Sequence, residues 1–106
     1  MKLVRKVRWS EVAQEYEVEW IAYLGEEVLP TDFRVHVAAG HVVFKRELTK
    51  EGDIYRGSTT YAEERIADVE QDTLKLIEAI KEEIKRAREN RVRAKALTVE
   101  LEFDVE

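Results

Sequence analysis

Cysteine is absent from this chain of 106 residues, and methionine and proline each occur only once. The lack of cysteine excludes a disulfide scaffold, a thiolate metal site and a cysteine nucleophile. No apolar run approaches the roughly 20 residues of a membrane-spanning helix, and the first residues lack the uninterrupted apolar core of a signal peptide. We therefore expect a cytoplasmic protein without a membrane partner, folded as a single domain over residues 1–106.

Recognisable catalytic and nucleotide-binding motifs are also missing. The segment 50–60 holds two glycines ahead of a predicted helix, but it lacks the lysine spacing of a P-loop. His36 and His41 are the only histidines, and no third metal ligand lies near them in the sequence. With Asp53 and Tyr55 they are the only candidates for catalysis, and no pattern indicates that the four converge. We expect a protein with no enzymatic activity, no cofactor and no metal, with His36 and His41 as the only metal candidates.

Charged residues are abundant by contrast, at 39% of the chain with a net charge of −5. A composition rich in charge and poor in cysteine resembles that of thermophile proteins, and small phage proteins share it. The negative balance argues against a general affinity for nucleic-acid phosphates. The charges are nevertheless zoned along the chain, because residues 2–8 and 85–95 are basic, whereas residues 11–27 and 100–106 are acidic.

Alternating apolar and polar residues predict the strands. The first hairpin joins residues 2–9 to residues 15–24 and places Lys6 and Arg8 opposite glutamates on one side of the sheet. A second hairpin turns at Ala39 and Gly40, since glycine supplies the positive φ of such a turn. That register makes His36 and His41 diagonal neighbours on one face.

A long helix is predicted from Thr60 to about Arg91. Thr60 as N-cap and Glu63 have capping-box spacing, and apolar residues follow at intervals of three and four. At about 1.5 Å per residue the helix would span roughly 48 Å, against about 26 Å for an eight-residue strand. Part of the helix should therefore overhang the sheet, and we expect this to be the first turns, around Tyr61, Ile66 and Val69.

Residues 97–105 alternate between apolar side chains at odd positions and polar, mostly acidic side chains at even positions, which predicts a last strand. The predicted fold is thus α+β. It has an antiparallel meander of four strands, one long helix packed on one sheet face, and a C-terminal fifth strand that returns to the sheet.

These patterns predict a non-enzymatic, self-associating protein–protein interaction module, such as an adaptor, inhibitor or assembly factor, with a homodimer favoured and a protein partner expected. The apolar interface candidates lie on the early helix or on the sheet face away from it. They are Tyr61, Ile66, Val69, Thr73, Val4, Ile21, Tyr23 and Val43. The alternative function is nucleotide or nucleic-acid binding through the glycine-containing segment and the basic helix end. Its candidate contacts are Lys85, Arg88, Arg91 and Arg93.

Overall fold

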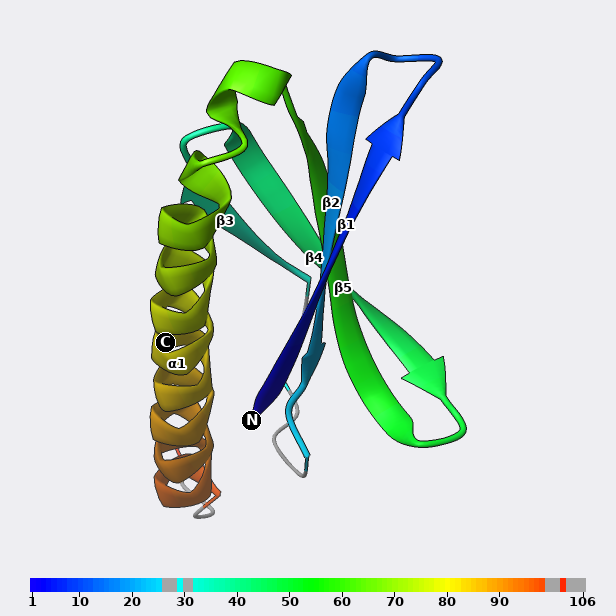
Figure 1. Ribbon diagram of the computed structural model, residues 1–106. Helices are drawn as coiled ribbons and strands as arrows, with labels where there is room; N and C mark the ends of the chain where they lie inside the picture. The colour runs from blue at the N-terminus through cyan, green and yellow to red at the C-terminus, as the bar shows by residue number, and fades with distance from the viewer. Residues whose placement is uncertain (26–28, 30–31, 99–101, 103–106) are drawn as a thin grey trace.

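The computed structural model describes residues 1–25, 29, 32–98 and 102, which form five strands followed by two helical elements (Figure 1). The strands are β1 (Lys2–Ser10), β2 (Glu15–Tyr23), β3 (Phe33–Val37), β4 (Gly40–Thr49) and β5 (Gly52–Tyr61). A 3₁₀ turn, η1 (Glu63–Arg65), leads into the helix α1 (Asp68–Leu97). The α+β class and the single long helix are confirmed. In the described part of the chain, no helix is long and apolar enough to cross a membrane.

The five strands form one antiparallel sheet in the order β1-β2-β5-β4-β3. The register of the first hairpin is confirmed, since Lys6 pairs with Glu19 and Arg8 with Glu17. Strand β4 changes partner along its length. Its residues 40–44 pair with β3, and its residues 45–49 pair with β5.

The glycine-containing segment 50–60 has no strand in the predicted fold, and this was wrong, because residues 52–61 form β5, the central strand of the sheet. Five strands rather than four precede the helix, and their order differs from the predicted meander, because β5 lies between β2 and β4 in the sheet. Gly57 made the segment look unlike a strand in the sequence, because glycine is uncommon inside strands. The fold nevertheless requires glycine at this position. A Cβ at Gly57 would lie 2.7 Å from Cγ1 of Val42, so any side chain would collide with the crossing strand β4.

The turn of the second hairpin lies one residue earlier than predicted. Gly40 pairs with Val37 and has a φ of +121°, so it follows the two-residue turn instead of belonging to it. A glycine with positive φ is common directly after such a turn. This register places His36 directly opposite His41 rather than diagonal to it.

The predicted helix boundaries were also wrong. Thr60 belongs to β5, and α1 begins at Asp68 after Ala67, whose position has no side-chain cap. The helix continues to Leu97, the residue predicted to open the last strand, and the Thr98 hydroxyl donates to the carbonyls of Ala94 and Lys95 at its end. The rest of the predicted C-terminal strand lies outside the described residues, apart from Glu102.

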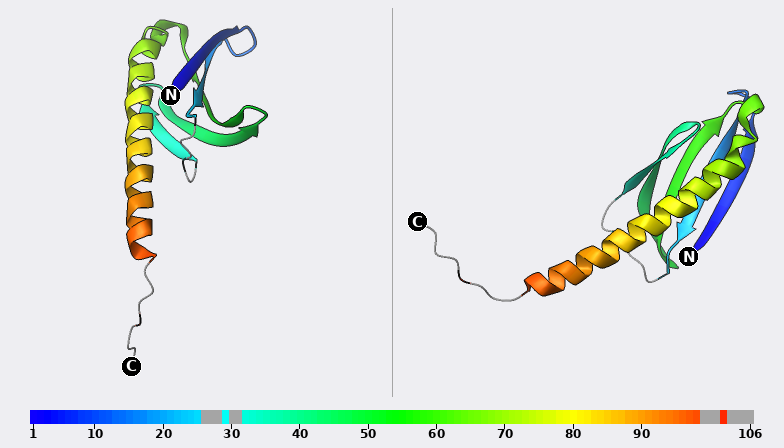
Figure 2. Two further views of the ribbon diagram at one scale, coloured as in Figure 1. Left: turned by 90° about the horizontal axis from the view of Figure 1, so that it is seen from below. Right: turned by 90° about the vertical axis from the view of Figure 1, so that its left-hand side faces the viewer.

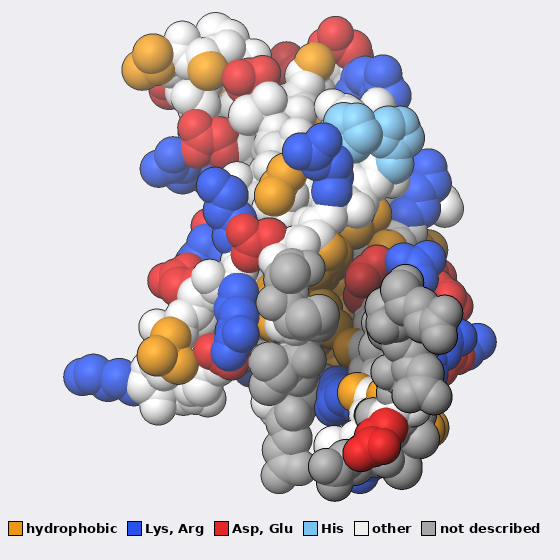
Figure 3. Space-filling model, turned by 180° about the vertical axis from the view of Figure 1, so that it is seen from behind, with side chains coloured by type: hydrophobic (Ala, Val, Ile, Leu, Met, Phe, Trp, Pro, Cys, Tyr) orange, Lys and Arg blue, Asp and Glu red, His pale blue; other side chains and the backbone are white. Residues whose placement is uncertain are grey.

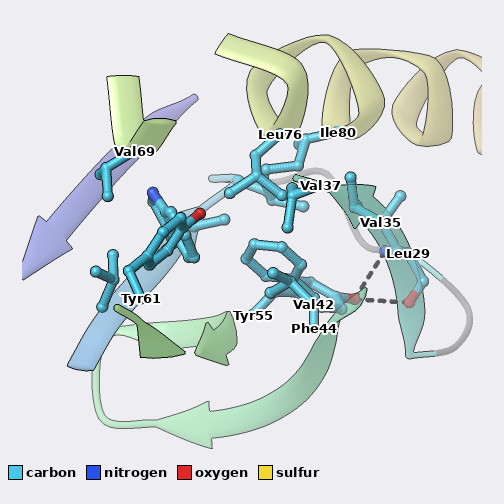
Figure 4. Close-up of a cluster of buried hydrophobic side chains, with 14 of the residues drawn as sticks. Leu29, Val35, Val37, Val42, Phe44, Tyr55, Tyr61, Val69, Leu76 and Ile80 are labelled. Carbon is cyan, nitrogen blue, oxygen red and sulfur yellow. Dashed lines mark hydrogen bonds between the residues drawn. The ribbon is translucent and has the colours of Figure 1, made fainter. Parts of the chain in front are cut away.

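The core lies between α1 and one face of the sheet (Figure 4). Fully buried side chains come from the middle strands and from the first half of the helix. They include Trp20, Val42, Phe44, Tyr55, Leu76 and Ile80. We call this covered side the helix face of the sheet and the opposite side the open face.

The overhang of α1 is at the end opposite to the predicted one. Val69, in the first turn, is buried in the core, and Ala87 is the last buried residue of the helix. From Arg88 onward every residue of α1 is exposed, and the helix continues well beyond the sheet (Figure 2). The first turns are held down by polar contacts that the apolar pattern alone did not reveal.

Candidate functional site

The start of α1 is tied to the sheet through a buried acid, Asp72. This residue is 0% exposed, and its carboxylate accepts hydrogen bonds from the Tyr61 hydroxyl at 2.6 Å and from the Ala38 amide at 3.0 Å. Lys75 Nζ lies 3.9 Å from the same carboxylate. Burial, and secondarily the bond to Asp72, raises the pKa of the Tyr61 phenol. Asp72 thereby connects α1 to the end of β5 and to the β3–β4 turn.

A second polar anchor lies one residue further along the helix, at Thr73. Its hydroxyl accepts hydrogen bonds from Trp20 Nε1 and from Arg5 Nη1, both at 3.1 Å, and donates to the Val69 carbonyl at 2.6 Å. Arg5 also pairs with Glu70 at 2.7 Å. These contacts tie the first turns of α1 to β1 and β2.

The interface candidates at the start of the helix therefore make their contacts within the same chain. Tyr61 is 2% exposed and Val69 is 5% exposed, and Ile66 packs partly buried against the core. Thr73 holds the hydrogen bonds described above. The reason is that the early turns of α1 are seated on the sheet, so these side chains contact the core and do not overhang. Their contact with a second copy stays a prediction, and the monomer fold gives them another role.

The four interface candidates on the sheet are split between two places on the open face. Val4 pairs with Ile21 across β1 and β2, and Tyr23 follows two residues later, beside Ile54 of β5. Ile21 and Ile54 are buried although neither belongs to the core under the helix. Val43 lies instead on β4, opposite Arg34. The open face thus holds a small apolar cluster whose central residues, Ile21 and Ile54, are already buried.

Charged side chains occupy most of the rest of the open face. Arg56, on β5, bridges Glu19 of β2 and Glu47 of β4 with two hydrogen bonds of 3.0 Å. Arg8 pairs with Glu17 on the first hairpin. Two depressions of about 490 and 560 Å³ adjoin Ser58. Half of the residues that line each depression are lysine, arginine or glutamate, and most of these already pair across strands, so they are engaged within the sheet rather than directed at a ligand.

The two histidines form a close pair. Their Nδ1 atoms are 3.0 Å apart on the exposed face of the β3–β4 hairpin, and Figure 3 shows both imidazoles side by side among lysine and arginine side chains. A metal about 2.05 Å from both nitrogens would make an N–metal–N angle of about 94°, nearer to square-planar or octahedral than to tetrahedral geometry. Among the residues that the structure describes, no group of three or more histidine, aspartate or glutamate side chains is placed to hold a metal. The pair alone therefore supports no metal centre.

The catalytic candidates do not form one site. The Tyr55 hydroxyl is engaged inside the core, where it donates to the Leu29 carbonyl at 2.7 Å and accepts from the Leu29 amide at 3.0 Å (Figure 4). Asp53 pairs with Arg46 at 2.6 Å near the β4–β5 turn. His36 and His41 bind each other on the other hairpin. Tyr55, Asp53 and the histidine pair thus make separate contacts within the fold. These contacts give each of them a structural role.

The basic helix end is exposed on the overhanging part of α1. Lys85, Arg88 and Arg91 recur every three residues, so each side chain is turned by about 60° from the one before it, whereas Arg93 is turned by about 160° from Arg91. Arg86 pairs with Glu83 at 2.8 Å along the same stretch. The glycine-containing segment that completed the anion site in the alternative function is the strand β5, so that half of the predicted site is absent.

Arg5 and Asp72 are not among the predicted site residues, although the position of each in its apolar pattern indicates a polar contact. Arg5 occupies the position between Leu3 and Val7 on the apolar side of an alternating strand. Asp72 lies next to Thr73 inside the apolar stripe of the helix. A polar residue at an inward position indicates a buried polar partner, and here the partners are on the facing element.

No family model, no curated protein and no solved structure matches this chain significantly.

Proposed function

We propose that this protein is a non-enzymatic interaction module that forms a homodimer. The observation that carries the proposal is the exposed last part of α1. Residues 88–97 extend about 15 Å past the last buried residue, at 1.5 Å per residue. Val92 and Leu97 on this segment are 69% and 79% exposed.

A helix segment that extends beyond its sheet lacks the packing contacts that stabilise most protein helices. Helices shorter than roughly 12–15 residues are marginal in water unless they pack against another element. The segment continues a helix that is already nucleated, but its exposed apolar side chains contribute nothing to the monomer core. A second copy that packs against these side chains stabilises the segment. This contact explains why the helix extends beyond its sheet.

The first test is the absolute mass in solution, by light scattering on a sizing column. We expect twice the monomer mass for the unaltered chain. Val92→Asp together with Leu97→Asp should shift the protein toward monomer. The matched control is Leu74→Asp, which alters a half-exposed leucine on the seated part of the same helix and should leave the dimer intact. A monomeric mass for the unaltered chain at high protein concentration contradicts the proposed function.

The exposed basic side chains of the same segment support a second candidate, nucleic-acid binding. Phosphate contacts from Arg88 and Arg91 would give an affinity that falls steeply with salt. Fluorescence anisotropy with a labelled oligonucleotide at low salt tests this, and Arg88→Glu with Arg91→Glu should abolish the signal. If the anisotropy does not change on titration at low salt, nucleic-acid binding is rejected. That outcome does not contradict the proposed homodimer.

A further inference from the structure

We propose that the outer edge of β1 binds an extended acidic segment of a partner protein, which adds to the sheet as a further strand. This interaction is separate from the proposed homodimer, which uses the end of α1. Three observations support it. Strand β1 is a long open edge, its charged side chains are all cations, and the described edges of a second copy would bring more basic side chains against it.

Strand β1 forms one edge of the sheet (Figure 1). It runs for nine residues and pairs with β2 on one side, and no strand lies on its other side within the described residues. Such an edge presents a row of backbone donors and acceptors that can pair with another strand. The opposite edge, β3, has only five residues and contacts α1. Strand β1 therefore offers the longer ladder to an incoming strand.

The charged side chains of β1 are all cations. Lys2, Lys6 and Arg8 lie on the open face, and Arg5 lies on the helix face, where it pairs with Glu70 of α1. Cations on an edge strand oppose pairing with apolar or cationic strands. An acidic strand instead converts the same charges into favourable cross-strand pairs. The composition of β1 therefore selects an acidic partner.

Lys6 is the clearest contact point for an incoming acid. It is exposed and lies opposite Glu19 of β2, but the Glu19 carboxylate accepts a hydrogen bond of 3.0 Å from Arg56. Arg8, the next cation on this face, is already paired with Glu17. Within the described residues no acid pairs with Lys6, so its ammonium group can contact a carboxylate on the outer side of β1.

Val7 adds an apolar requirement on the other face. It lies on the helix face and is still 47% exposed. A strand that pairs with β1 places one of its own side chains directly beside Val7, and the next one along on the open face near Lys6. Arg5 already has an acid in Glu70, so no further acid is needed beside it. The partner segment should therefore alternate acidic and apolar residues.

The described edges of a second copy do not supply such a strand. Pairing β1 with the β1 of another copy brings the cations of two open faces together, and like charges on facing strands are destabilising. The other edge strand, β3, carries Arg34 and His36 on its open face, so it also brings basic side chains. Charge complementarity therefore favours an acidic segment of a different protein.

The experiment uses a short synthetic peptide as the probe. Its glutamate and valine residues alternate over the length of β1, its ends are blocked, and it carries a fluorescent label. Binding to the full chain is measured by fluorescence anisotropy at about 0.1 M salt, where the Debye length is about 10 Å. The control peptide has the same composition, with all glutamates in one block and all valines in another. We expect the alternating peptide to bind about tenfold more tightly, because only it matches both faces of β1 in one register.

Two matched variants locate the binding site. Lys6→Glu reverses a charge on β1, and Lys45→Glu reverses one on the open face of β4, three strands away or roughly 14 Å. Both lysines are exposed, so both variants should keep the fold, which circular dichroism checks. We expect Lys6→Glu to weaken binding of the alternating peptide about tenfold and Lys45→Glu to change it by less than about threefold. Equal losses for the two variants would overturn the proposed location.

Backbone pairing is tested with two further peptides, each N-methylated at every second amide. Successive amides of a strand point to opposite sides, so only one of the two methylated sets faces β1. Strand addition predicts that one of these peptides loses binding about tenfold or more and that the other keeps most of its affinity. Equal effects for both peptides would mean that the probe binds through charge alone, and would overturn strand addition.

The remaining outcomes separate this proposal from the homodimer. An alternating peptide that does not bind at all overturns the acidic partner and has no bearing on the mass of the chain. If the peptide does not bind and Lys6→Glu also abolishes the dimer mass in light scattering, a second copy occupies the β1 edge in place of a different protein. A monomeric mass for the unaltered chain contradicts the proposed function but leaves peptide binding at β1 as a separate result.

Discussion

The seated part of α1, from Asp68 to Ala87, and its overhanging part, from Arg88 to Leu97, belong to one continuous helix but have different surroundings. Both parts contain exposed apolar residues, Leu74 in the seated part and Val92 and Leu97 in the overhanging part, but the buried apolar residues of α1 all lie in the seated part. The seated part also has Asp72 and Thr73, whose hydrogen bonds reach three strands and one turn. The comparison shows that the seated end of this helix combines buried apolar side chains with polar anchors, and that the overhanging end has no buried side chain.

The sharpest way to test this comparison is to place the same charge in each part. Val69→Asp puts a carboxylate into the core, so we expect the free energy of unfolding to fall by more than about 4 kcal/mol. Val92→Asp changes an exposed position, and we expect the monomer's unfolding free energy to change by no more than about 0.5 kcal/mol. Urea denaturation followed by circular dichroism measures both, at a protein concentration low enough for the unaltered chain to be monomeric by light scattering. Equal losses for the two variants would show that the overhanging part is packed within the monomer.

Removal of the anchor itself should have the next largest effect. Asp72→Ala leaves the Tyr61 hydroxyl and the Ala38 amide without their acceptor, and we expect a loss of about 2–4 kcal/mol in unfolding free energy. The matched control is Glu78→Ala, which removes an exposed acid of the same helix that pairs with Lys81 and should change stability by less than about 0.5 kcal/mol. If Asp72→Ala unfolds no more easily than the control, the anchor does not hold the helix.

The sequence predicted the first hairpin well because two independent patterns, apolar alternation and facing charges, agree there. It also predicted the helix, because an apolar stripe at intervals of three and four persists over many turns. It missed β5 because Gly57, Ser58, Thr59 and Thr60 resemble a loop, and only the crossing of β4 over Gly57 explains the glycine. It placed the overhang at the wrong end because a C-terminal strand was predicted directly after the helix, and a short link to that strand would hold the last turns close to the sheet.

The candidate site was less predictable than the fold. The interface candidates came from apolar residues that lacked a visible partner in the sequence, and Tyr61 and Val69 found theirs within the chain. Partners such as Asp72 and Ala38 lie 34 residues apart, and no local pattern connects them.

Alkaline pH provides a third, smaller test of the anchor. Burial and the bond to Asp72 raise the pKa of Tyr61 above its ordinary value of 10 in the folded state. The stabilisation is therefore complete below about pH 10 and is lost as the pH rises from there through the folded-state pKa. In that window Tyr61 alone should lower the unfolding free energy by about 1.4 kcal/mol per pH unit. Denaturation at several pH values should show a slope shallower by this amount in Tyr61→Phe. An unchanged slope would mean that Tyr61 is not held neutral by the fold.

The smallest expected effects separate the two partners of Arg5. Thr73→Val keeps the shape of the side chain but removes the acceptor for Trp20 Nε1 as well as for Arg5, so we expect a loss of about 1–2 kcal/mol in unfolding free energy. Glu70→Gln removes only a carboxylate charge on a side chain that is 75% exposed, and such surface pairs contribute about 0–1 kcal/mol. Raised salt should weaken the Glu70 contribution more than the Thr73 contribution, because screening acts on exposed charges and little on the part-buried hydrogen bond that the neutral Trp20 Nε1 donates to Thr73. Urea denaturation at two salt concentrations measures both. A salt-insensitive loss for Glu70→Gln that equals the loss for Thr73→Val would show that the ion pair, not the hydroxyl, fixes the first turns of α1 to β1.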